Sequence, residues 1–297
     1  MKLYNIVPSQ RSFQKSQSVH GYALLSPTLA VLLTALAAPI ALLLLYSFWT
    51  ENGFVLDTSP TLAQYGTVLT REGYRVLFLR SIAISSLVTL VTVGLAYPMA
   101  YFVAFRVSFG KFIWLLLLTI PFWTSYLLRV FAWKVILGYN GVINSGLISL
   151  GLISEPLEFL LYNPTAVVVT LAHAYAAFAI LPIYVSLEKI DRSLLEAAAD
   201  LGDGPVRRFW RVTLPLSLPG VIGAAVLIFV PTTGDYVTPT LVGGSDGVMI
   251  ANIIQVQFGR VNNWPLGAAL AISSMAAVAV IAAFVIQAVR LSVARIR

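Results

Sequence analysis

The chain has 297 residues, of which 59% are hydrophobic and only 10% charged, with a formal net charge of +7 and no cysteine. A soluble domain cannot bury that much apolar surface, so the composition predicts an all-α, polytopic integral membrane protein. The absence of cysteine excludes disulfides, thiol catalysis and cysteine-ligated metal. The positive charge lies in no basic run, which argues against a nucleic-acid partner and for a bias set by membrane topology.

Six apolar segments follow one another, each long enough for the ~20 residues that cross a bilayer core of ~30 Å. The first resembles a cleaved signal near Ala35, but its apolar run continues to Tyr46, which is too long. We expect a polar N-terminal segment at 1–21, a transmembrane domain at 22–291 and a tail at 292–297. The expected spans are 22–49, 77–105, 112–136, 164–185, 216–236 and 265–291, with Pro27 and Pro39 kinking the first, Pro121 interrupting the third, and 147–161 forming a partly exposed loop or short helix.

Lysine and arginine are distributed unequally between the two sides that six spans create. If the N-terminus lies inside, the cytoplasmic side holds 13 of the 19 basic residues, which by the positive-inside rule places both termini in the cytoplasm. The cytoplasmic set is Lys2, Arg11, Lys15, Arg106, Lys111, Lys189, Arg192, Arg207, Arg208, Arg211, Arg290, Arg295 and Arg297; the other set is Arg71, Arg75, Arg80, Arg129, Lys134 and Arg260.

A polar, charged segment at about 188–215 separates the fourth and fifth spans. Ser193 and Glu196 have the spacing of a capping box, which predicts a helix of about two turns. Gly202 is free to adopt the left-handed conformation that ends it, and Pro205 is suited to start a second short helix. Two short helices joined by a glycine hinge indicate a docking element, the alternative being an ordinary interfacial loop.

This segment resembles the EAA loop of binding-protein-dependent ABC importer permeases, with Val212 where that family usually has isoleucine. The resemblance implies a type I ABC importer permease fold and a cytoplasmic loop whose short helix inserts into a groove on the ATPase subunit. The docking residues that it implies are Glu196, Ala197, Ala198, Asp200, Gly202, Leu214 and Pro215.

Further stretches resemble the spermidine/putrescine-type permeases. They are Pro121 to Trp133, Leu181 to Tyr184, Val242 to Gly244, Ile250 to Phe258 and Asn263 to Ala269. Permeases for opines, phosphonates and other small organic solutes look similar, so a polyamine is the expected solute and these alternatives stay open.

A path for a polyamine should offer carboxylates, backbone carbonyls and aromatic faces. Asp235, followed by Tyr236, lies where Pro231 and Gly234 should break the fifth span; the alternative is a helix-end acid in water or paired with Arg260. Trp123, Tyr126, Phe131 and Trp133 form either an aromatic wall for the solute or an interfacial belt.

Arg129 is a charge within the aromatic third span. It would repel a polyamine, so we expect it to pair with an acid such as Asp235 or Glu158, or to act as a gate. Its charge also means that an anionic solute stays possible. His173 is expected to be a hydrogen-bonded packing residue rather than part of a proton relay. Small residues are expected to allow close helix packing, namely Ala174, Ala176, Ala177, Ala179, Ala268, Ala269 and Ala271.

The sequence contains no phosphate-binding P-loop, and we predict no catalytic, cofactor or metal site in this chain. The resemblance implies two ATPase subunits that bind ATP and Mg, a second permease of paralogous sequence and a periplasmic solute-binding protein, in a bacterial inner membrane. A secondary transporter or channel is the alternative, but it predicts intramembrane ionisable pairs and inverted repeats that are not evident. A membrane enzyme would need clustered His, Asp or Glu.

Overall fold

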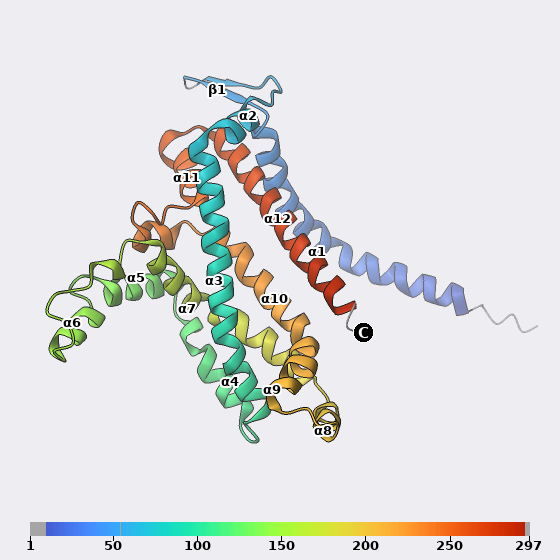
Figure 1. Cartoon of the computed structure of the whole chain (residues 1–297). Helices are drawn as coiled ribbons and strands as arrows, with labels where there is room; N and C mark the ends of the chain where they lie inside the picture. The colour runs from blue at the N-terminus through green and yellow to red at the C-terminus, as the bar shows by residue number, and fades with distance from the viewer. Residues whose placement is uncertain (1–9, 54, 295–297) are drawn as a thin grey trace, which may run out of the picture.

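The structure, a computed structural model, describes residues 10–53 and 55–294, with 10–23, 52 and 288–294 described by their backbone alone (Figure 1). Lys2, Arg295 and Arg297 of the expected cytoplasmic set therefore lie outside the described residues. The long elements are α1 (Gln10–Tyr46), α3 (Glu72–Phe105), α7 (Pro164–Glu188), α10 (Leu214–Thr233) and α12 (Trp264–Ala294).

Shorter elements connect these helices. They are β1 (Thr50–Asn52), β2 (Val55–Asp57), α2 (Ala63–Thr70), α4 (Lys111–Thr119), η1 (Ile120–Trp123), α5 (Tyr126–Leu137), α6 (Val142–Ser149), η2 (Glu158–Leu160), α8 (Arg192–Asp200), α9 (Pro205–Arg208), η3 (Phe209–Thr213), η4 (Pro239–Gly243), α11 (Ile250–Val256) and η5 (Gln257–Val261). The strands β1 and β2 pair antiparallel, with Thr50 opposite Asp57.

Five helices of the described chain are long and apolar enough to cross a membrane, and a bent pair raises the number to six. These segments match the six expected spans, which confirms the all-α, multi-pass fold. The first helix, α1, continues through both Pro27 and Pro39 and bends along its length in Figure 1. The hairpin β1–β2 and the helix α2 were not expected from the sequence.

The third span is not the single segment, interrupted at Pro121, that the sequence predicts. Residues 111–123 and 126–149 form two helical arms that meet at 85°. Pro121 lies in the first turn of η1, which continues α4 without a gap, so its missing N–H removes one bond to the preceding turn. The break comes at Thr124, whose backbone is extended and whose hydroxyl donates to the carbonyl of Pro121 at 2.8 Å. Tyr126 therefore starts a new helix.

The core consists of α3, α7 and α10, which pack against one another along their lengths (Figure 1). Because lipid is as apolar as the side chains, close packing of small residues holds such helices together. Ala174, Ala177 and Ala179 of α7 and Ala268 and Ala269 of α12 are buried, which confirms the expected packing role of these alanines. At Gly220 of α10, an added Cβ would lie 2.5 Å from the carbonyl oxygen of Pro182.

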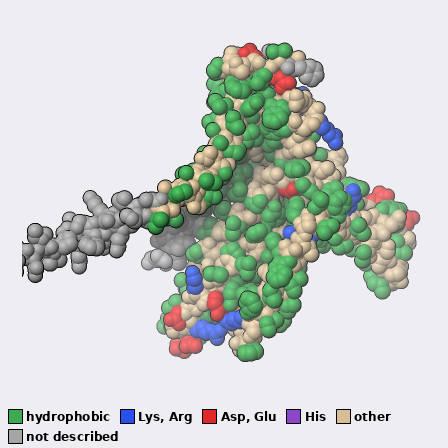
Figure 2. Space-filling model, turned by 180° about the vertical axis from the view of Figure 1, so that it is seen from behind, with side chains coloured by type: hydrophobic (Ala, Val, Ile, Leu, Met, Phe, Trp, Pro, Cys, Tyr) green, Lys and Arg blue, Asp and Glu red, His purple; other side chains and the backbone are tan. Residues whose placement is uncertain are grey.

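The two ends of the bundle differ. In Figure 1, α8, α9 and the start of α4 lie at one end, and β1, α2 and α11 lie at the other. The space-filling view in Figure 2 shows hydrophobic side chains over the middle of the molecule and charged side chains gathered at the end formed by α8 and α9. We call this end the docking end.

Candidate functional site

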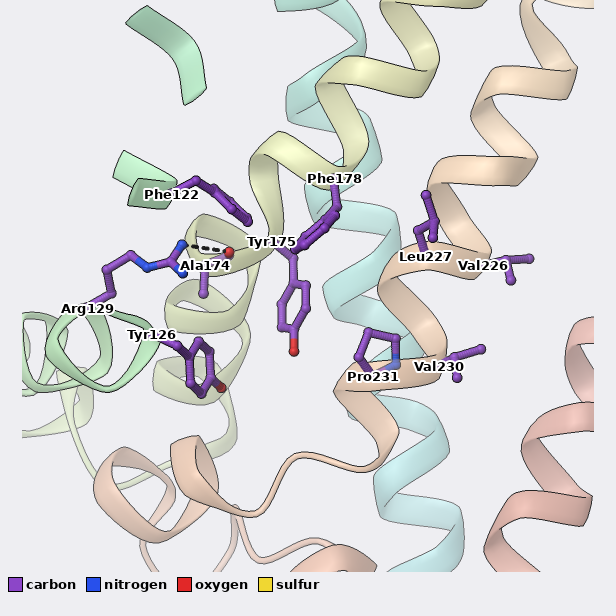
Figure 3. A pocket seen from close by; sticks show the side chains of 10 residues that line it. All are labelled: Phe122, Tyr126, Arg129, Ala174, Tyr175, Phe178, Val226, Leu227, Val230 and Pro231. Atoms are coloured by element: carbon purple, nitrogen blue, oxygen red, sulfur yellow. Dashed lines mark hydrogen bonds between the residues drawn. The ribbon is translucent and has the colours of Figure 1, made fainter. Parts of the chain in front are cut away.

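A hollow of about 680 Å³ opens between α5, α7 and α10, next to the break in the third span (Figure 3). Its lining is almost entirely apolar and aromatic, with one charged side chain, that of Arg129. The lining residues are Phe122, Tyr126, Arg129, Ala174, Tyr175, Phe178, Val226, Leu227, Val230 and Pro231. Such a lining suits a methylene chain or another apolar body with few polar groups.

Tyr126 connects this hollow to a buried carboxylate. Its hydroxyl donates to Oδ2 of Asp235 at 2.5 Å and lies 2.6 Å from the hydroxyl of Thr238. The other carboxylate oxygen of Asp235 accepts from the backbone N–H of Val237 at 2.9 Å. Asp235 is only 8% exposed, so it is neither a helix-end acid in water nor paired with Arg260, the two alternatives considered from the sequence.

Asp235 lies behind Tyr126 rather than in the wall of the hollow, because it is absent from the lining while its partner is present. The position follows from the local backbone: α10 ends at Thr233, Gly234 caps it, and Asp235 then accepts from the N–H two residues on. An ammonium group in the hollow would meet the carboxylate only after the tyrosine hydroxyl gives way.

Arg129 has no acid partner within the described residues, so the expected pairing with Asp235 or Glu158 is wrong. Its Nη1 donates to the backbone carbonyl of Ala174 at 3.0 Å, and its guanidinium stacks over Phe122 at 4.5 Å from the ring centre. Its Nε is buried without a hydrogen-bond partner in the described chain. Helix α5 turns Arg129 toward α7, and aromatic faces take the place of a carboxylate.

The other aromatic residues proposed from the sequence lie elsewhere. Trp123 is 74% exposed and lies off the hollow, and Phe131 is also exposed. Trp133 packs edge-on against His173 with the ring centres 5.5 Å apart, which gives His173 a packing contact but no hydrogen bond within the described structure. Tyr236 borders a different hollow, beside α11 and α12.

Three aromatic residues of the hollow were not selected from the sequence. Phe122 and Phe178 meet edge to face at 4.9 Å, and Tyr175 lies 5.9 Å from Phe178. The spacing of three between Tyr175 and Phe178 places them on one face of α7, which is the sequence pattern that predicts their proximity. Nothing in the sequence indicates that this face points to Phe122.

The docking segment begins with a different cap from the one predicted. Asp191 is the N-cap of α8, and its Oδ1 accepts from the backbone N–H of Ser193 at 3.0 Å. The capping box of Ser193 and Glu196 is therefore wrong, because the helix already starts at Arg192. The N–H of Ser193 lowers the pKa of the exposed Asp191 carboxyl from its ordinary value.

The end of α8 follows the prediction. Gly202 has a φ of +85°. Its N–H donates to the carbonyl of Ala199 at 2.9 Å, and the N–H of Asp203 donates to that of Ala198 at 3.0 Å. This pair of bonds is a Schellman motif, whose left-handed residue is usually glycine because a side chain strains most other residues in that conformation. Pro205 stands at the start of α9, as predicted.

Apolar side chains are exposed around this glycine hinge. Leu201 is 88% exposed, and Val206 and Trp210 are also largely exposed. They lie beside exposed charges, including the predicted docking residues Glu196 and Asp200. Glu196 borders a hollow of about 360 Å³ that Arg106, Arg192 and Arg208 also line. Exposed apolar residues on a charged, well-capped loop are typical of a protein-interaction surface.

The loop is anchored to the bundle on its inner side. Phe209 of the π-helix η3 packs against Tyr97 and Tyr101 of α3, with ring centres 5.7 and 6.3 Å apart. Asp203 accepts from Arg211 at 3.2 Å, and helix α10 then follows with Leu214 and Pro215 in its first turn. The described residues contain no group of three or more His, Asp or Glu side chains that could hold a metal ion.

The fold of this chain is that of ABC importer permeases. It superposes with a TM-score of 0.71 and 18% identity on a chain of a bacterial alginate ABC transporter in complex with an alginate pentasaccharide-bound periplasmic protein, covering 91% of this chain and 93% of that one. A second alginate transporter structure superposes with the same TM-score and 17% identity, covering 95% and 99%.

The chain belongs to the family of binding-protein-dependent transport system inner membrane components, whose model matches residues 24–296. It is 35% identical to the spermidine/putrescine transport system permease protein PotB of Haemophilus influenzae, covering 79% of this chain and 82% of the relative. It is 37% identical to PotB of Escherichia coli, covering 72% and 77%, and 32% identical to the inner membrane ABC transporter permease protein YdcU of that organism, covering 82% and 81%. The chain is therefore a multi-pass inner-membrane permease subunit without catalytic function of its own.

Proposed function

We propose that this chain is one permease of a heteromeric ATP-driven importer for polyamines, such as spermidine and putrescine, or a related small organic solute. The observation that carries the solute class is the 35–37% identity to spermidine/putrescine permeases over most of the chain. The partners are a paralogous permease, two ATPase subunits that bind ATP and Mg, and a periplasmic solute-binding protein.

The docking end faces the cytoplasm in this proposal, together with both chain termini. The described basic residues Arg106, Lys111, Lys189, Arg192, Arg207, Arg208 and Arg211 belong to elements of that end, as the positive-inside rule requires. The segment 188–215 contacts an ATPase subunit through the exposed Glu196, Ala197, Asp200 and Gly202, while Leu214 and Pro215 pass its movement to α10. Ala198, also selected from the sequence, is buried and supports the helix from its inner side. The exposed Leu201, Val206 and Trp210 supply the apolar part of that contact.

The solute passes the aromatic hollow. Tyr126 and Asp235 offer an ammonium group a hydroxyl and, when the tyrosine moves, a carboxylate. Arg129 is held against Phe122 and disfavours a second positive charge at its end of the hollow. Repulsion of that kind keeps binding weak enough for release, which transport requires. Trp123, Trp133 and Tyr236 stay outside the hollow in this conformation and contact solute only in another one.

The test is ATP hydrolysis by the complete complex in lipid, with its binding protein and a panel of solutes. Stimulation by spermidine or putrescine supports the proposal, and stimulation only by neutral solutes contradicts the polyamine assignment. The variant Glu196→Lys should lose stimulation while the chain stays inserted in the membrane. Normal stimulation of that variant would remove Glu196 from the docking contact.

A small solute with a carboxylate is the alternative that one observation favours. Arg129 carries a permanent charge and lacks an acid partner within the described residues, and an anionic solute would supply one. In the same assay, stimulation by a carboxylate-bearing solute such as an opine, but not by putrescine, identifies this case.

A further inference from the structure

One ion pair at the docking end joins three helix ends. Nζ of Lys111, the first residue of α4, donates to both carboxylate oxygens of Glu188 at 2.7 and 2.8 Å. Glu188 is the last residue of α7. The same ammonium group donates to the backbone carbonyl of Ala104, in the last turn of α3, at 3.0 Å.

The charges of this pair suit the helix ends only in combination. The last carbonyls of α3 and α7 lack intrahelical donors and carry partial negative charge, so an ammonium group near them is favourable. Glu188 alone would be unfavourable at the end of α7, because its charge has the sign of that helix end. The two side chains are therefore interdependent.

Stability does not account for the pair. The side chains of Lys111 and Glu188 are 23% and 41% exposed. An ion pair with this much exposure to solvent adds little to the free energy of unfolding. Its consequence is geometric: it fixes the start of α4 against the end of α7.

Helices α4 and α7 both run from this ion pair to the hollow, and α7 is also followed in the chain by the docking helix α8. Glu188 comes three residues before Asp191, the cap of α8. Upstream, α7 contributes Tyr175 and Phe178 to the hollow. From Lys111, α4 runs through η1 to the break, beyond which α5 carries Tyr126 and Arg129.

We propose that Lys111 and Glu188 are positioning residues that couple the docking helix α8 to the broken helix α4–α5. When α8 moves with an ATPase subunit, the ion pair carries α4 along with the end of α7, so the wall that holds Tyr126 moves with the wall that holds Tyr175. The inference rests on the proposed docking of α8, and it adds a connection outside the docking loop itself.

The experiment measures solute transported per ATP hydrolysed by the complete complex in lipid vesicles. Lys111→Glu and Glu188→Lys should each lower this ratio by about fivefold or more while the subunits stay assembled and ATP hydrolysis continues. The double variant Lys111→Glu/Glu188→Lys should recover to within about twofold of the native ratio. In the swapped pair, the acid stands at the start of α4 and the base at the end of α7, placements that the helix dipoles favour in each single variant as well. The swap does not restore the bond to the carbonyl of Ala104, so recovery in the double variant reports the contact between α4 and α7.

Two controls accompany these variants. Arg75→Glu reverses an exposed charge of α3 at the opposite end of the bundle and should leave the ratio unchanged. Lys111→Arg keeps the charge and should retain coupling. If a charge reversal prevents assembly, Lys111→Gln removes the pair without opposing charges and should lower the ratio in the same way.

The outcomes separate this inference from the docking proposal. Normal coupling in both single variants, or a double variant that assembles without recovery, overturns the role of the ion pair. If Glu196→Lys couples normally while Lys111→Glu does not, the docking contact of Glu196 fails and the ion pair keeps its role. If Lys111→Glu couples normally while Glu196→Lys does not, the ion pair has no role in coupling and the docking contact of Glu196 stands.

Discussion

The hydroxyl of Tyr126 lies 2.5 Å from the carboxylate of Asp235, although 109 residues separate them in the sequence. The contact joins the start of α5 to the segment that follows α10. Tyr126 lines the hollow and Asp235 does not, so this hydrogen bond connects the hollow to a carboxylate behind its wall. Both residues are therefore suited to testing the path of the solute.

Replacing Asp235 by asparagine should weaken transport of a polyamine. The change removes the negative charge but keeps the shape and one acceptor. A hydrogen bond to a charged group contributes about 1.5–3 kcal/mol, so the solute concentration for half-maximal transport should rise roughly 10- to 100-fold. Kinetics of uptake into vesicles measure it. Thr238→Val, which removes the other partner of Tyr126 and keeps the charge, is the control, and unchanged kinetics for Asp235→Asn would exclude Asp235 from the path.

Gly202 should tolerate asparagine far better than valine. An added Cβ meets nothing within 4 Å, so the cost of substitution comes from the φ of +85° alone. A β-branched residue there costs about 1–2 kcal/mol, whereas asparagine enters the left-handed region readily. We expect Gly202→Val to impair binding of the ATPase subunits, measured by co-purification, and Gly202→Asn to retain most of it. Equal binding by the two variants would show that the left-handed cap does not matter for docking.

Gly220→Ala should destabilise the helix bundle, and Gly223→Ala should not. The new methyl group at Gly220 would lie 2.5 Å from the carbonyl oxygen of Pro182, whereas at Gly223 it meets nothing within 4 Å. Overpacking of this kind costs about 1–3 kcal/mol. Thermal unfolding of the purified protein in detergent measures the difference. A transition temperature as high for Gly220→Ala as for Gly223→Ala would show that α7 and α10 separate without cost.

Asp191→Ala should weaken docking, and Asp191→Asn should preserve it. Alanine leaves the N–H of Ser193 without its acceptor, whereas asparagine still caps the helix. Because the pKa of Asp191 is lowered, the native cap stays charged at neutral pH, and its stabilisation is lost only as the pH falls through that lowered value. Binding of the ATPase subunits at pH 7 and under acidic conditions checks this, with the asparagine variant as the pH-insensitive control. Full binding by Asp191→Ala would contradict the capping role.

Local chemistry allowed much of the docking segment to be predicted. Gly202 ends α8 and Pro205 starts α9, because left-handed conformation and fixed φ are properties of single residues. The start of α8 was predicted two residues too late. Asp191 and Ser193 are both residue types that cap helices well, so local chemistry alone does not choose between them. The choice depends on where α7 ends, at Glu188, and Lys111 contacts that end from another helix.

The hollow could be predicted only in part. Arg129 and Asp235 stood out because charged groups are rare in or beside apolar spans, and Tyr126 was selected as one of four aromatic residues that could line a path. Their partners did not follow, because a membrane helix is apolar on every side and its periodicity does not show which face meets a neighbour. Opposite charge suggested that Arg129 pairs with an acid, whereas the bend of 85° in the third span turns it toward Phe122 and Ala174.

The sequence by itself determined that this protein lies in a lipid bilayer, how many spans it has and in what order, and where the exposed loop lies. These features depend on segment length, charge and the conformations of glycine and proline. Tertiary structure alone decided that Tyr126 meets Asp235, that Arg129 stacks on Phe122, and that Lys111 ties α4 to α7. Tyr126 and Asp235 are far apart in the chain, as are Lys111 and Glu188, whereas Arg129 and Phe122 are close in sequence but lie on the two arms of the 85° bend. All three contacts depend on how helices bend and pack, which the apolar pattern of a membrane helix does not specify.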